Sequence, residues 1–80
     1  MNYYETSDLG LTATFVTLGY PVLNMLETNG KFMFTFEETE HTKDIVNDYF
    51  GNGVDVNAKS YYYNLRDLKK HIYATENTKR

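Results

Sequence analysis

Several features that would assign a chemistry are absent from this sequence of 80 residues. It has no cysteine, which excludes a disulfide framework, thiolate chemistry and any cysteine-based zinc site. It also lacks a glycine-rich phosphate-binding loop, a Gly-x-Ser-x-Gly motif, and the His-Glu-x-x-His and EF-hand spacings. No motif supports catalysis, and we therefore expect a non-enzymatic protein that needs no cofactor.

Long apolar runs are missing as well. No window approaches the length of a membrane span, and the sequence after Met1 lacks the basic and apolar regions of a secretory signal. We therefore expect a soluble cytoplasmic protein. Eighty residues suffice for one small domain, which we place at residues 1–74, followed by a frayed polar tail at residues 75–80.

Positive charge is scarce over most of the chain. Residues 1–57 carry two cations against nine carboxylates, whereas residues 58–80 carry six cations against two carboxylates. The net charge of −3 argues against general binding to duplex nucleic acid. The uneven distribution has two explanations: the two parts complement each other within or between chains, or the basic end binds an anionic ligand.

Residues 20–37 form the stretch whose structure can be predicted best, as a β-hairpin. Asn29-Gly30 favours a two-residue type I′ turn, because both central residues of that turn need a positive φ. The turn fixes the register, and directly opposed residues share a face of the hairpin. The predicted pairs are Thr28 with Lys31, Glu27 with Phe32, Met25 with Phe34 and Leu23 with Phe36, which places Leu23, Met25, Phe32, Phe34 and Phe36 on one face.

The first helix is expected between a capping segment, Thr6-Ser7-Asp8, and Gly19. It is apolar on two sides, although its β-branched residues keep a strand open as an alternative. One side can cover the phenylalanines of the hairpin, and the other then lacks a partner within the chain. We therefore predict a homodimer or a partner interface at the second side; the two sides are Leu9, Ala13 and Val16, and Leu11, Phe15 and Leu18.

Two further helices are expected after the hairpin. One begins at the cap Thr39 and ends at Gly51, and the other runs from Ala58 to Ala74 behind a cap at Asn57 or Asp55. With a short strand at residues 2–5, the sequence predicts an α+β domain of order β-α-β-β-α-α. Its three-stranded antiparallel sheet carries the helices on the face of Phe32, Phe34 and Phe36.

Two groups of polar residues could form a site. The junction Glu37–His41 holds carboxylates and an imidazole, but no second ligand group follows at a recognised spacing, so we expect no metal; a metal enzyme would need Glu38, Glu40 and His41 to converge. On the third helix, aromatic and cationic residues alternate. We expect Tyr61 and Tyr62 in the core and a possible contact for an anionic ligand on the outer face; the candidates are Lys59, Tyr63, Arg66 and Lys70.

Five stretches of the sequence carry a resemblance to a known family: Tyr4–Leu11, Gly19-Tyr20, Phe34–Glu37, Asp48–Phe50 and Leu65–Lys69. In these stretches the chain resembles a family of small uncharacterised proteins carried by bacteriophages and prophages. The resemblance implies a context, the cytoplasm of a bacterial host, and no activity. Short phage accessory proteins often bind a host protein or sequester a small signal, including in the inhibition of antiviral defences. We therefore expect a non-enzymatic binding protein that inhibits or sequesters a host factor. The alternatives are a nucleotide sponge that uses the anionic-ligand candidates, and a nucleic-acid-binding regulator that uses the basic third helix.

Overall fold

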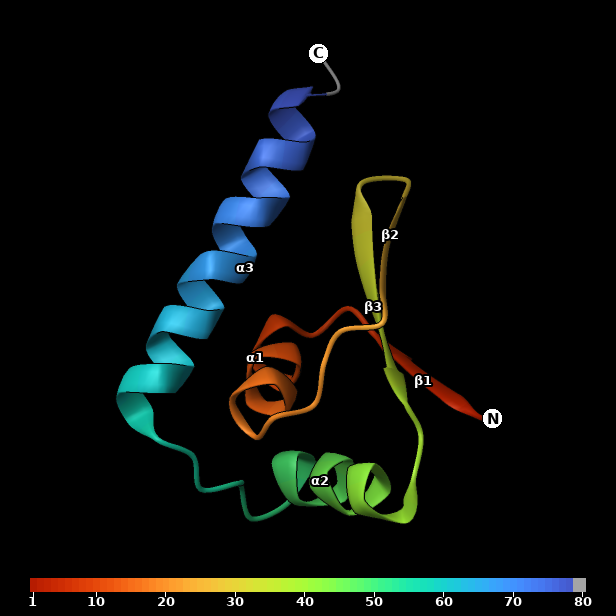
Figure 1. Ribbon diagram of the computed structural model, residues 1–80, viewed down its shortest axis with the longest axis vertical. Helices are drawn as coiled ribbons and strands as arrows, with labels where there is room; N and C mark the ends of the chain where they lie inside the picture. Colours follow the sequence, from red (N-terminus) through yellow and green to blue (C-terminus); the bar gives the residue numbers. More distant parts are fainter. Residues whose placement is uncertain (79–80) are drawn as a thin grey trace.

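The computed structural model describes the backbone of residues 1–78 and the side chains of residues 1–75 (Figure 1). It has the predicted α+β architecture and the predicted order of elements. The three strands form one antiparallel sheet in the order β1-β3-β2. The elements are β1 (Tyr3–Thr6), α1 (Leu9–Thr17), β2 (Asn24–Thr28), β3 (Lys31–Glu37), α2 (Glu40–Phe50) and α3 (Ala58–Thr78).

The hairpin of β2 and β3 has the predicted turn and register. Asn29 and Gly30 both have a positive φ, of 54° and 80°, and the pairs up to Met25 with Phe34 are as predicted. Leu23 departs from the prediction. Its N–H donates to the carbonyl of Thr35 at 2.8 Å, although Asn24 is already the residue opposite Thr35. Two residues opposite one is the arrangement of a β-bulge, which takes Leu23 off the buried face and leaves it exposed.

Helix α1 begins where Asp8 caps it, because the Asp8 Oδ1 accepts a hydrogen bond from the N–H of Leu11 at 2.9 Å. Three threonine hydroxyls donate to the carbonyls four residues earlier in the chain. These bonds satisfy the hydroxyls, so Thr12 and Thr14 can be buried inside the protein. The helix is therefore the correct interpretation of this segment, and the alternative of a strand is wrong.

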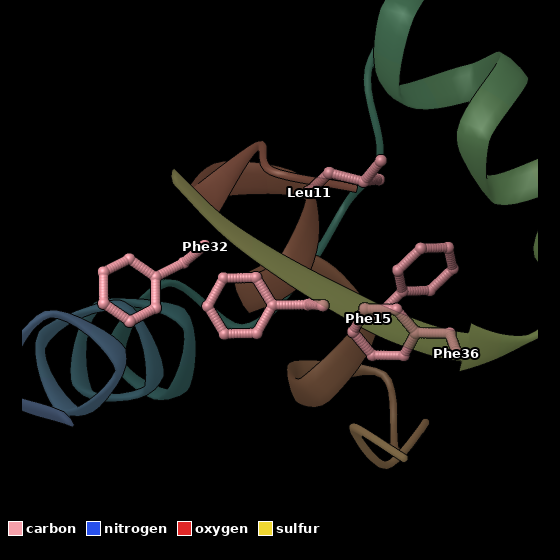
Figure 2. Close-up of a cluster of buried hydrophobic side chains, with 5 residues drawn as sticks. Leu11, Phe15, Phe32 and Phe36 are labelled. Atoms are coloured by element: carbon pink, nitrogen blue, oxygen red, sulfur yellow. The ribbon is translucent and has the colours of Figure 1, made fainter. Parts of the chain in front are cut away.

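Both apolar sides of α1 are covered within the chain. On one side the Phe15 ring packs against Phe36 of β3, with ring centroids 4.6 Å apart (Figure 2). On the other side lies α3, whose Asn64 amide donates to the Thr17 hydroxyl at 2.9 Å. Helix α1 is thus the central element of the domain, between α3 and the sheet (Figure 1). The core cluster consists of Leu11, Phe15, Phe32, Phe34 and Phe36.

This arrangement corrects the predicted self-association surface. Leu11 and Phe15 are fully buried, and only Leu18 of that predicted set is exposed. The prediction was wrong because the side that it left without a partner, that of Leu11 and Phe15, packs against the sheet. Helix α3 packs on the other side of α1, where Val16 and Leu68 line the same groove.

The ends of the later helices follow local rules. Thr39 caps α2 as predicted, in a reciprocal pair of hydrogen bonds with Thr42. Asn57 caps α3, since its side chain accepts from the N–H of Ser60 at 2.9 Å. Helix α3 continues to Thr78, beyond the predicted end at Ala74, and residues 79–80 of the predicted tail lie outside the described part of the chain.

Candidate binding surface

The outer face of α3 is the surface on which the predicted ligand contacts come together. On an α-helix, residues three and four apart lie on the same side, and seven residues of α3 fall within an arc of about 120° that points away from the core. All seven are exposed. We call this set the α3 outer face, and it consists of Lys59, Tyr62, Tyr63, Arg66, Lys69, Lys70 and Tyr73.

The aromatic residues of this face are ordered by contacts with their neighbours. The guanidinium carbon of Arg66 lies 4.8 Å from the centroid of the Tyr63 ring, which is a cation–π contact. The Tyr62 ring meets the Tyr63 ring edge-on, with centroids 5.6 Å apart. Tyr62 is 60 % exposed, so the prediction that it enters the core is wrong, whereas Tyr61 is half-buried. The face therefore offers a partner two tyrosine rings in edge-on contact and a guanidinium that lies over one of them.

The charge on the α3 outer face has one sign. Four of its seven residues are cations and none is a carboxylate. Asp67 lies on the flank of α3 and lines a groove beside the helix. It is the one acidic residue among the α3 side chains that the structure describes. A face with cations, aromatic rings and no carboxylate favours an anionic partner over a neutral or cationic one.

The acidic junction before α2 has a structural role. Thr39 caps the helix, and the Glu38 carboxylate lies 3.9 Å from the Lys43 ammonium. Within the part of the chain that the structure describes, no group of three His, Asp or Glu residues is placed so that it could hold a metal ion. Glu38, Glu40 and His41 thus do not form a metal centre there.

A half-buried polar contact that the sequence did not reveal lies where the three helices meet. The Tyr49 hydroxyl of α2 donates to the Asp8 carboxylate at 3.1 Å, and Gly10 of α1 leaves room for it. A Cβ on Gly10 would overlap the Tyr49 hydroxyl and lie 3.3 Å from the hydroxyl of Tyr61 in α3. Burial and the hydrogen bond to Asp8 raise the pKa of Tyr49 to about 12. A phenol with this pKa stays protonated at neutral pH, so its hydroxyl donates to Asp8 and links α2 to the start of α1.

A second exposed surface is the side of the sheet that no helix covers. It carries Tyr3 at 56 % exposure and Leu26 at 55 %, with Met33 opposite Leu26. Its side chains are mixed in character, because Glu5, Thr35 and Lys31 lie among them. It lacks the single sign of charge that distinguishes the α3 outer face.

The sequence of this chain matches a protein-family model over most of its length. The sequence fits, over residues 1–74, the model of a family described as a domain of unknown function (DUF5659). No curated protein and no solved structure matches the chain. Among the described helices, none combines the length and the apolar character that crossing a membrane requires.

Proposed function

We propose that this chain, which belongs to the DUF5659 family of domains of unknown function, is a non-enzymatic binding protein. It docks on an acidic surface of a partner protein through the α3 outer face. The observation that carries this proposal is the Arg66 guanidinium stacked 4.8 Å over the exposed Tyr63 ring, on a face without carboxylates. Tyrosine and arginine are the residue types that most often supply the binding energy of an interface.

The order of these side chains supports a binding role. Holding Tyr62, Tyr63 and Arg66 in place before binding lowers the conformational entropy lost on association, which is about 0.5–1.5 kcal/mol for each immobilised side chain. The flanking lysines add attraction for an acidic partner and raise the rate of encounter. The α3 outer face thus has both an ordered centre and a charged surround.

The partner that we propose is a host protein. This part of the proposal rests on the resemblance to phage-borne accessory proteins, whose usual effect is to block or sequester a component of the host. An antiviral defence protein with an acidic surface is the corresponding target class.

A second candidate function is the binding of a nucleotide or a nucleotide-like signal. The stacked Tyr63 and Arg66 favour it, because an aromatic ring beside a guanidinium can hold a base while Lys59 or Lys70 contacts a phosphate. Helix α3 offers no walls that would enclose such a ligand, since Tyr62, Tyr63 and Tyr73 are all exposed. A protein surface fits this open, convex face better.

The experiment compares two double variants with the wild type as baits in a host lysate. In the test variant, Tyr62→Ser and Arg66→Ser remove an aromatic ring and a cation from the α3 outer face. In the matched control, Tyr3→Ser and Lys31→Ser remove the same kinds of group from the uncovered side of the sheet, where Tyr3 is as exposed as Tyr62.

A protein that co-purifies with the wild type is then produced alone, and its affinity for each variant is measured by calorimetry. We expect the test variant to lose affinity by at least about tenfold, as expected when hot-spot residues are removed, and the control to keep it. If only the control variant lost affinity for the partner, the interface would lie on the uncovered side of the sheet. Retention of a nucleotide by the wild type, in place of a protein, would favour the second candidate function.

A further inference from the structure

Helix α3 extends well past α1, and a groove lies between its middle part and the hairpin. The helix has 21 residues against nine in α1, which makes it longer by about 18 Å at about 1.5 Å per residue. Beyond α1 the helix stands opposite β2 and β3 (Figure 1). A cavity of about 290 Å³ lies between these elements, close to the lower end of the range for small-molecule sites, which is about 300–1,000 Å³.

The cavity has an apolar floor and a polar edge. Met25 and Phe34 of the hairpin, Val16 of α1 and Leu68 of α3 supply the apolar surface. The polar residues all come from α3, where Asn64, Asp67 and His71 follow one another at intervals of three and four along one flank. The amide of Asn64 is held by its hydrogen bond to Thr17, so this part of the edge is fixed.

Asp67 is the one carboxylate that lines this cavity. The sequence places Lys70 and His71 at the helical spacings that favour an ion pair with it. Among the described residues, however, Asp67 makes no ion pair within 4.0 Å. The comparable hollow between β1 and α2 differs, because there the Glu38 carboxylate already faces the Lys43 ammonium at 3.9 Å. Asp67 is exposed at the edge of the cavity, so its carboxylate is available to a cation whose apolar part lies in the cavity.

We propose that this groove binds a small organic cation in which a protonated amine is attached to an apolar or aromatic body. The ammonium group donates hydrogen bonds to the Asp67 carboxylate, and the body lies against Met25, Phe34 and Leu68. This site lies on the flank of α3 next to the cationic outer face, and it does not depend on the function proposed for that face.

The test uses two probes of similar size and opposite charge, phenethylammonium and 3-phenylpropionate, added to the protein with labelled methyl groups. Methyl resonances of Val16, Met25 and Leu68 report on the groove. We expect phenethylammonium to shift them in a saturable way at millimolar concentration or below. The carboxylate probe should bind at least about tenfold more weakly, as expected when an ionic hydrogen bond is replaced by repulsion.

Variants identify the group that recognises the cation. Asp67→Asn should weaken the binding of phenethylammonium by about tenfold, whereas the matched change Asp44→Asn, at an exposed carboxylate of α2, should leave it unchanged. Wild-type spectra in which neither probe shifts the groove methyls would overturn the proposal. So would equal binding of the two probes, or unchanged binding to Asp67→Asn. Arg66→Ser should not affect the probes, so failure here is separable from failure of the α3 interface.

Discussion

Replacing Gly10 by alanine tests the polar contact that lies where the three helices meet. At an ordinary position inside a helix this change stabilises a protein by about 0.5–1 kcal/mol, because alanine has the higher helix propensity. In α1 the new Cβ would overlap the Tyr49 hydroxyl, which donates to Asp8. The Tyr49 ring packs against the core, which limits how far its hydroxyl can move away.

The expected cost follows from the contact that is lost. A hydrogen bond to a charged group contributes about 1.5–3 kcal/mol, and displacing the Tyr49 hydroxyl breaks such a bond to the Asp8 carboxylate. Subtracting the gain in helix propensity leaves a net loss of about 0.5–2.5 kcal/mol. Gly10→Ala should therefore destabilise the protein, against the usual direction of this substitution.

Urea unfolding of four proteins provides the assay: the wild type, Gly10→Ala, Tyr49→Phe and the double variant. Tyr49→Phe removes the hydroxyl that the new methyl group would meet, so Gly10→Ala should cost much less in that background or stabilise it. The two changes should thus be non-additive by at least about 1 kcal/mol. Additivity within about 0.3–0.5 kcal/mol, or a wild type that Gly10→Ala stabilises, would refute this account of the packing.

Three further predictions concern the core and the pH dependence of stability. Phe34→Ala should lower the free energy of unfolding by about 3–5 kcal/mol in urea unfolding, because the ring is 1 % exposed; a loss below about 1 kcal/mol would contradict its burial. Phe15→Glu should unfold the chain, as followed by circular dichroism, and a folded variant with a changed sedimentation coefficient would instead place Phe15 in an interface. Folding raises the pKa of Tyr49 from 10.0 to about 12, so the folded chain holds this proton more tightly than the unfolded chain. The stability that this difference contributes is complete below pH 10 and is lost as the pH rises from 10 to 12. In urea unfolding across this range the wild type should therefore lose more stability than Tyr49→Phe, and parallel curves would contradict the assigned cause.

The hairpin could be predicted from the sequence because its determinants are local. Asn29-Gly30 fixes the turn, and the turn fixes the register as far as Met25 and Phe34. The prediction placed Leu23 on the wrong face because a bulge at the start of β2 interrupts the alternation of faces. No glycine or proline within β2 indicates this bulge in the sequence.

The covering of α1 could not be predicted because it depends on contacts distant in sequence. The two apolar sides of this helix were recognised correctly, but periodicity does not say which element packs on each side. The contact between Asn64 and Thr17 spans 47 residues, and the one between Tyr49 and Asp8 spans 41. The α3 outer face was predicted in part, since Lys59, Tyr63, Arg66 and Lys70 are determined by the helical repeat alone.

The α3 interface is tested most directly by a photo-crosslinking amino acid, p-benzoylphenylalanine. It is placed at position 63 or at position 3 of the protein in a cell of the proposed bacterial host. It replaces Tyr63 on the α3 outer face in one protein and Tyr3 on the uncovered side of the sheet in the other, two exposed tyrosines of the same chain. We expect a protein adduct from position 63, with the crosslinked peptide of the partner rich in aspartate and glutamate, and no such adduct from position 3. An adduct from position 3 alone, or none from position 63, would contradict it.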